Sequence, residues 1–126
     1  MPRQVVMTDK VARPRVPLSN AVKAGGLVFV SGTVGFAVDG QVARGDFGAQ
    51  IRQTLDNVKA VLEAAGSSLD RVVKVNVILA RAADFAAMNE IYRTYFREGN
   101  YPARTPIEAR LMNPDLLVEI ECVAEV

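Results

Sequence analysis

The spacing of apolar residues changes after Asp46, and this change limits the folds that the chain can adopt. From there, apolar side chains recur at steps of three and four residues, at Phe47, Ile51, Leu55, Val58, Leu62 and Ala65. Such spacing places them on one stripe of an α-helix. Asp46 can accept hydrogen bonds from the first helical N–H groups, and Gly66 suits the left-handed residue at a helix end. The sequence therefore predicts an amphipathic helix over residues 47–65.

The period then shortens to two, which is typical of a strand. Val73, Val75, Val77 and Leu79 alternate with Lys74, Asn76 and Ile78, so we expect a strand with one fully apolar face. A second helix follows, with Asp84 as its cap and Gly99 beyond its end. Its predicted core side chains are Phe85, Met88, Ile91, Tyr92, Tyr95 and Phe96. We assign these aromatic residues to the core and not to a surface that stacks on bases.

All six prolines lie near the two ends of the chain, so residues 18–101 can hold uninterrupted elements. Further strands are expected on either side of the helices. They are predicted at residues 4–7, 27–30, 104–111 and 116–126, with a hairpin whose turn is Asp39-Gly40. The predicted order is β-β-β-α-β-α-β-β. We therefore expect an α+β fold in a single domain over residues 1–126, with two helices packed on one face of a mixed sheet.

The scarcity of histidine and cysteine limits the metal sites and catalytic groups that the chain can form. The chain has no histidine and only one cysteine, Cys122, which excludes a closed structural zinc site and every catalytic pair that uses histidine. We expect no metal. The net charge of +1 does not suggest a nucleic-acid binder. Neither a signal-peptide core nor a run of about 20 apolar residues is present, so we expect a cytoplasmic protein without membrane contact.

The last strand separates its side chains by chemistry. Val118, Ile120, Cys122 and Ala124 share one face, and Glu119, Glu121 and Glu125 share the other. Leu117 and Val123 also lie on the acidic face, and the preceding strand supplies Arg104. An arginine opposite a glutamate on a partly apolar surface is costly unless it serves binding or is paired. Solvated glutamates on an open sheet are the ordinary alternative.

Five segments together resemble the RidA/YjgF family of reactive intermediate deaminases. They are residues 27–32 (LVFVSG), 53–58 (QTLDNV), 85–92 (FAAMNEIY), 101–104 (YPAR) and 118–121 (VEIE). They occur in the family's order, and the resemblance extends over nearly the whole chain. The resemblance implies a chorismate-mutase-like fold and a homotrimer, in which the sheets form a central barrel and three clefts lie between subunits.

The resemblance also implies a site. Arg104 would bind the substrate carboxylate, Glu119 would position and deprotonate a water molecule, Asn89 would line the cleft, and the backbone of Gly32 would approach the ligand. The implied activity is hydrolysis of imines or enamines, such as 2-iminopropionate or 2-aminoacrylate, to 2-keto acids and ammonia without a cofactor. Two positions depart from the family pattern. Pro106 stands where active members commonly carry a cysteine, and Leu18 replaces a frequent tyrosine.

These departures keep other functions open. One alternative is a trimeric binding or sensor protein for small keto or imino carboxylates that has lost turnover. Another is a deaminase dedicated to one pathway, such as an aminomuconate-like step in aromatic catabolism. RNA binding or cleavage is a third, against which the near-neutral charge and the lack of histidine argue.

Overall fold

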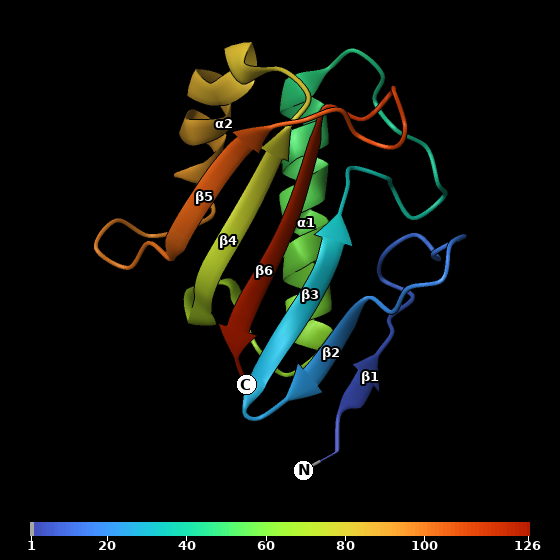
Figure 1. Ribbon diagram of the computed structural model, residues 1–126, viewed down its shortest axis with the longest axis vertical. Coiled ribbons are helices and arrows are strands. Elements are labelled where there is room, and N and C mark those ends of the chain that lie inside the picture. Colours follow the sequence, from blue (N-terminus) through green and yellow to red (C-terminus); the bar gives the residue numbers. More distant parts are fainter. Residues whose placement is uncertain (1) are drawn as a thin grey trace.

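The computed structural model describes residues 2–126 and contains one six-stranded mixed sheet (Figure 1). The spatial order of its strands is β1-β2-β3-β6-β4-β5, and only the β4–β5 pair is parallel. The last strand in the sequence is therefore central, and β5 lies at an edge. The strands are β1 (Gln4–Val6), β2 (Ala21–Ala24), β3 (Leu27–Thr33), β4 (Val72–Leu79), β5 (Ala103–Glu108) and β6 (Val118–Glu125).

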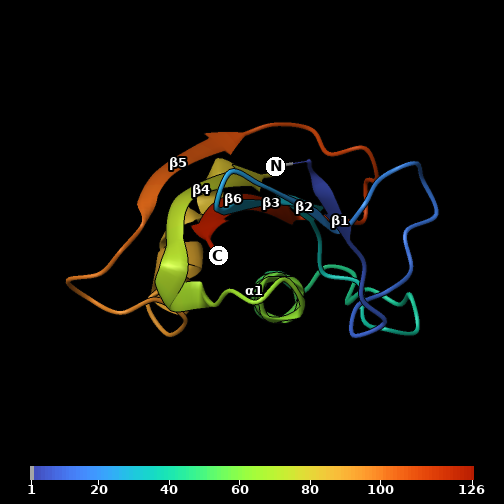
Figure 2. The ribbon, with the colours of Figure 1, turned by 90° about the horizontal axis from the view of Figure 1, so that it is seen from below.

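Both helices cover the same face of the sheet, as predicted. Figure 2 shows the sheet curving over α1 (Phe47–Ala64), and in Figure 1 α2 (Phe85–Tyr92) lies behind β4 and β5. Two short 3-10 helices, η1 (Leu69–Arg71) and η2 (Ala82–Asp84), flank β4. The opposite face of the sheet carries no helix. Among residues 2–126, no helix is long and apolar enough to cross a membrane.

The pattern that predicted α1 is confirmed in detail. The side chain of Asp46 accepts a hydrogen bond from Ala49 N at 3.0 Å, and Gly66 has the positive φ of +85° that follows a helix end. The apolar stripe packs against β6, where Val118, Ile120, Cys122 and Ala124 are all buried. The buried apolar residues of helices and strands form one cluster.

The position of the first hairpin was predicted wrongly. Asp39-Gly40 does form a tight turn, in which Ala37 N donates to Gln41 O, but no strand flanks it. The hairpin instead joins β2 to β3 through Gly25 and Gly26, which both have positive φ. Two consecutive glycines can adopt the backbone of a two-residue hairpin turn as readily as Asp-Gly can. The number of strands before α1 is still three.

The apolar face of β4 is also interrupted at its start. Val75, Val77 and Leu79 are buried as predicted, whereas Val73 is 43% exposed. The reason is a register shift against β6 between Val72 and Lys74, which inserts one residue and reverses the alternation before it. A period of two cannot reveal such a bulge, because the bulge depends on the partner strand.

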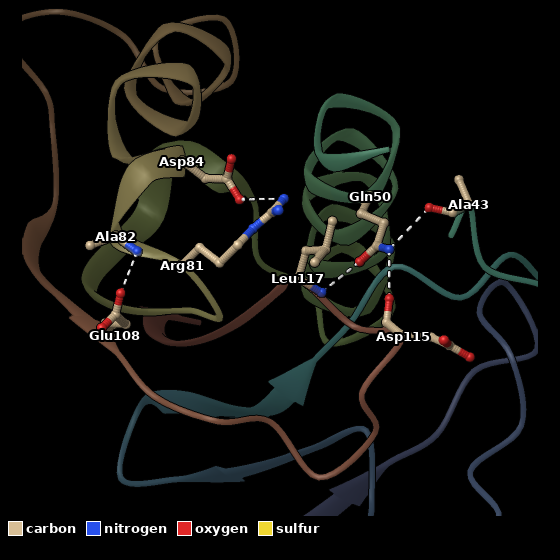
Figure 3. Close-up of polar contacts among 8 residues, drawn as sticks. All are labelled: Ala43, Gln50, Arg81, Ala82, Asp84, Glu108, Asp115 and Leu117. Carbon is tan, nitrogen blue, oxygen red and sulfur yellow. Dashed lines mark hydrogen bonds and ion pairs between the residues drawn. The ribbon is translucent and has the colours of Figure 1, made fainter. Parts of the chain in front are cut away.

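The start of α2 is stabilised by a residue that is distant in sequence. Asp84 occupies the N-cap position but makes no capping hydrogen bond, and its carboxylate instead pairs with Arg81 at 3.3 Å. Glu108, at the end of β5, accepts a hydrogen bond from Ala82 N at 2.6 Å (Figure 3). The predicted cap at Asp84 was therefore wrong in its contact, although the helix begins where expected. Phe85, predicted in the core, is 42% exposed.

A buried amide joins α1 to two loops. Gln50 is fully buried, and its Nε2 donates to Ala43 O at 3.0 Å and to Asp115 O at 2.9 Å (Figure 3). Its Oε1 accepts from Leu117 N at 2.8 Å. All three partners are backbone groups, so Gln50 fixes the chain just before α1 and just before β6. This holds the start of β6, and with it Glu119, against the helix layer.

Replacing Gln50 with leucine is expected to lower the free energy of unfolding by about 3 kcal/mol, because it leaves two carbonyls and one N–H without their partner. Urea unfolding at equal protein concentration measures the change. Gln41→Leu is the matched control, since Gln41 is exposed and the structure shows no hydrogen bond from its side chain. Equal stability of the two variants would contradict this role for Gln50.

Candidate functional site

Arg104 lies on the helix side of the edge strand β5. It pairs with Val75 of β4, whose side chain is buried under the helices, so both point to that layer. The guanidinium carbon of Arg104 sits 4.8 Å from the ring centroid of Tyr92 and 5.8 Å from that of Phe85. Its Nη1 approaches Met88 Sδ at 3.6 Å. An arginine over aromatic faces is stabilised by cation–π attraction, which here fixes its direction.

The charge of Arg104 is left available to a ligand. Within residues 2–126 it forms no ion pair, and it lines a cavity of about 240 Å³ together with Asn89, Tyr92, Arg93 and Tyr101. Asn89 and Arg104 were both predicted as binding residues, and the structure brings them to the same cavity. A guanidinium with free N–H groups next to an amide suits a planar carboxylate.

Tyr92 contributes more than core packing. It was correctly predicted to be buried, but its ring also lies against Arg104, a contact that its helical spacing did not predict. Among residues 2–126, its hydroxyl is the one buried side-chain polar atom without a hydrogen-bond partner. Burial raises the pKa of Tyr92 to about 12, although the nearby Arg104 charge opposes this. The phenol is therefore neutral at pH 7 and retains its proton as a donor.

Glu119 lies on the open face of the sheet, next to Gly32. It pairs with Ile78 of β4, and a Cβ atom placed on Gly32 would overlap the Oε2 atom of Glu119. Only glycine leaves room for the carboxylate there. A register shift between Val30 and Thr33 sets two residues of β3, Ser31 and Gly32, against a single residue of β6. Bulges of this kind redirect side chains and occur often beside active sites.

Burial and a neighbouring charge make the Glu119 carboxylate more basic. Desolvation is the larger cause that raises the pKa of Glu119, and the charge of Glu121 raises it further. Glu121 itself accepts a hydrogen bond from Asn76 Nδ2 at 2.9 Å. A carboxylate with a raised pKa is a better acceptor for a proton from water than an ordinary surface glutamate.

Arg104 and Glu119 do not meet within one chain. They were expected on neighbouring strands, but β4 lies between β5 and β6. Their pairing with Val75 and Ile78, at a strand spacing of about 4.8 Å and a rise of about 3.3 Å per residue, separates their Cα atoms by about 14 Å. The two side chains also leave opposite faces of the sheet. The expectation that Arg104 and Glu119 lie on adjacent strands and share one face of the sheet was therefore wrong.

The two departures from the family pattern fall in different places. Pro106 lies in β5 on the same face as Arg104, and its missing N–H is tolerated because β5 is an edge strand. Leu18 is 42% exposed in the loop before β2 and lines a second, larger cavity that Gly32 also borders.

Burial raises the pKa of the Cys122 thiol to about 12, so this cysteine is no nucleophile at neutral pH. No group of three or more acidic, cysteine or histidine side chains within residues 2–126 is arranged to hold a metal.

The open face carries a row of apolar side chains across four strands. Val5, Val22, Phe29 and Val123 are paired in succession from β1 to β6. Val5 is 49% exposed and Phe29 46%, and Ile107 on β5 is 50% exposed. A contiguous apolar surface of this kind usually marks a contact with another molecule.

Comparison with known proteins assigns the fold. Residues 8–126 match the family described as endoribonuclease L-PSP. The structure superposes on RidA from the Antarctic bacterium Psychrobacter sp. PAMC 21119 with a TM-score of 0.91 and 39% identity, covering 98% of this chain and 99% of that one. It also superposes on the YjgF gene product of E. coli with a TM-score of 0.89 and 34% identity, covering 97% and 98% of the two chains. This chain belongs to the RidA/YjgF family.

Relatives of similar length support the assignment. A RutC family protein of Pyrococcus horikoshii is 43% identical over 125 residues, which cover 97% of each chain. A RutC family protein of Synechocystis sp. is 38% identical over 128 residues, which cover 98% of this chain and 97% of the relative. The predicted RidA-like fold, with its mixed sheet and two helices on one face, is therefore confirmed.

Proposed function

We propose that this RidA/YjgF protein hydrolyses imines and enamines of 2-amino acids to 2-keto acids and ammonia, in clefts between the subunits of a homotrimer. The observation that carries the proposal is the state of Arg104. Its guanidinium is held on an aromatic surface beside Asn89, without an acidic partner in residues 2–126. An unpaired cation fixed in a cavity is suited to a carboxylate ligand.

The placement of Arg104 and Glu119 on opposite faces of the sheet supports assembly into a trimer. Arg104 and Glu119 leave opposite faces of one sheet, so a second chain is needed to bring such groups together. The apolar row on the open face gives that second chain a surface to bind. In a ring built from identical head-to-tail contacts, Arg104 of one subunit faces Glu119 of the next, and each trimer has three equivalent sites.

The chemistry needs only positioning and one proton acceptor. An enamine first tautomerises to the imine, whose C2 is electrophilic. Arg104 holds the carboxylate next to C2, and the Glu119 carboxylate takes a proton from water as the water oxygen bonds to C2. Glu119 gives this proton to the imine nitrogen, so the resulting carbinolamine has a hydroxyl and an amine on C2. The Glu119 carboxylate then takes the hydroxyl proton as the keto group forms and passes it to the nitrogen, so that the C–N bond breaks and ammonia leaves.

The proposal is tested with an imine generated in solution. An amino-acid oxidase converts alanine to 2-iminopropionate, which hydrolyses spontaneously to pyruvate and ammonia or reacts with an added amine trap. Purified protein should raise the rate of pyruvate formation and lower the yield of trapped imine. Unchanged yields over a range of imino acids would contradict the proposal.

The pH at which kcat/KM falls on the acidic side of its profile should depend on Glu121. Glu119 acts as a carboxylate, so kcat/KM is expected to fall as the pH drops through its raised pKa. Glu121→Gln removes the second cause of that raised pKa and keeps a hydrogen-bond acceptor for Asn76, so the fall should move to lower pH. Burial remains, so the pKa should stay above that of a free glutamate. Wild type and variant are compared on one imine, which cancels ionisation of the substrate. An unmoved profile would exclude Glu119 as the titrating group.

Pro106 favours one alternative function. It occupies the position beside Arg104 where active relatives were expected to carry a cysteine, and it offers neither a thiol nor an N–H group. A protein that binds keto acids without turnover would fit that replacement. Calorimetry that shows binding of pyruvate through Arg104, together with no hydrolysis of any imine, would favour this function.

A further inference from the structure

The cavity at Arg104 has a second positive charge on its border. Within residues 2–126 it is lined by two arginines, two tyrosines and an amide, and none of these side chains is acidic. They are Asn89, Tyr92, Arg93, Tyr101 and Arg104. Its volume of about 240 Å³ equals that of about eight water molecules at roughly 30 Å³ each, which leaves room for a four- or five-carbon acid. The cavity is therefore small and cationic.

The end of helix α2 places Arg93 on the same side as Asn89. Arg93 directly follows the last residue of α2, keeps helical angles (φ −61°, ψ −21°) and donates its N–H to Asn89 O at 3.1 Å. Residues four apart on a helix lie on one face, about 6 Å apart along the axis. Asn89 and Arg93 therefore line the cavity from one face of α2, and Arg104 enters it from β5.

The guanidinium group of Arg93 has no acidic partner within residues 2–126. The next arginine along the chain, Arg97, does have one, because it pairs with Asp70 at 3.1 Å. Arg93 and Arg104 are thus two like charges on the border of one small cavity, and they repel each other. A ligand with two negative charges offsets this repulsion, and each arginine can hold one carboxylate.

We infer that this cavity binds acids with two carboxylates, of which Arg104 holds the one next to the keto or imine carbon and Arg93 holds the other. On the proposed function, on which this assignment of substrate class rests, the preferred substrates are imines of amino acids whose side chains end in a carboxylate. The glutamate-derived imine, 2-iminoglutarate, is one of them, and its hydrolysis consumes one water molecule and gives 2-oxoglutarate and ammonia. Because Arg93 is exposed, its contact is expected to raise affinity by only about tenfold.

Calorimetry with two matched keto acids tests this binding without catalysis. 2-Oxoglutarate and 2-oxopentanoate have the same five-carbon chain and differ only in a terminal carboxylate or methyl group. The wild-type protein should bind 2-oxoglutarate about tenfold more tightly. High salt should reduce this difference, because it screens the contact with the exposed Arg93. Equal affinities, or tighter binding of 2-oxopentanoate, would overturn the inference.

Two arginine variants locate the second carboxylate. Arg93→Gln removes the charge but keeps much of the length of the side chain, so the ratio of the two affinities should fall to one or below. Arg97→Gln is the matched control, because it removes the same charge four residues further along, and Arg97 does not border this cavity. It should leave the ratio unchanged. A ratio that Arg93→Gln does not lower, or that both variants lower equally, would contradict the inference.

The corresponding imines separate this inference from the proposed function. The glutamate-derived imine should exceed the norvaline-derived imine in kcat/KM by about tenfold, and Arg93→Gln should abolish the preference. If both imines are hydrolysed with equal kcat/KM, the proposed reaction stands and the inference fails. If neither is hydrolysed, the proposed function fails, and the ratio of keto-acid affinities still decides the inference. If neither keto acid binds, the inference fails, and the imine assays alone decide the proposed function.

Discussion

Replacing Arg104 with alanine is expected to lower kcat/KM for imine hydrolysis by about 100- to 1,000-fold, mainly through a higher KM. The reason is that a desolvated carboxylate loses the cation that binds and orients it. The guanidinium is held by Tyr92 and Phe85 and by no salt bridge within residues 2–126, so its charge has no structural partner there. Its removal should therefore affect binding more than folding.

Two further variants test whether the planar pair of guanidinium N–H groups is needed and whether the effect is specific to Arg104. Arg104→Lys keeps the charge but loses the paired N–H groups and the flat contact with Tyr92, so most of the loss should remain. Arg110→Ala removes an exposed arginine outside strand β5 and should leave kcat/KM unchanged. Steady-state kinetics on the alanine-derived imine measure all three. Full activity in Arg104→Ala would contradict the assignment of the carboxylate site.

Replacing Glu119 with glutamine is expected to lower kcat by about 100- to 10,000-fold with little change in KM, because the amide cannot accept a proton from water. The side chain keeps its size, so the tight fit against Gly32 is maintained. Product affinity measured by calorimetry should stay near the wild-type value. This combination separates loss of chemistry from loss of binding.

The control for Glu119 lies on the same strand. Glu125 shares the open face of β6 and is exposed near its end, far from Gly32. Glu125→Gln should leave kcat unchanged, because it removes one negative charge from the same face without touching the site. If both variants lose activity equally, the effect comes from the charge of that face and not from a proton acceptor.

Local patterns predicted most of the elements. The stripe from Phe47 to Leu62 identified α1 because the helix buries one face against β6, and residues on one face of a helix recur every three or four positions. The alternation from Val118 to Ala124 identified β6 because a strand that buries one face repeats every two residues. The hairpin between β2 and β3 was missed because Gly25-Gly26 and Asp39-Gly40 both satisfy turn geometry, and only strand pairing distinguishes them.

The site was harder to predict than the fold. Sequence motifs named Arg104, Asn89, Glu119 and Gly32, and the structure places the first two in one cavity and the last two side by side. Proximity in sequence wrongly joined the two pairs, because a strand from the middle of the chain, β4, inserts between β5 and β6. The stacking of Arg104 on Tyr92 was missed because helical spacing indicates which residues are buried but not what they touch. The bulge at Gly32 depends on the register with β6, which the sequence does not specify.

The most direct test of the shared site is a subunit-mixing experiment. Arg104→Ala and Glu119→Gln chains, each inactive alone, are co-expressed with different tags, and assemblies that contain both are purified. If Arg104 of one subunit works with Glu119 of the next, each mixed trimer has both groups in one of its three sites, so activity returns to about a third of wild type. Mixed assemblies that stay as inactive as their parents would contradict a catalytic site shared between chains.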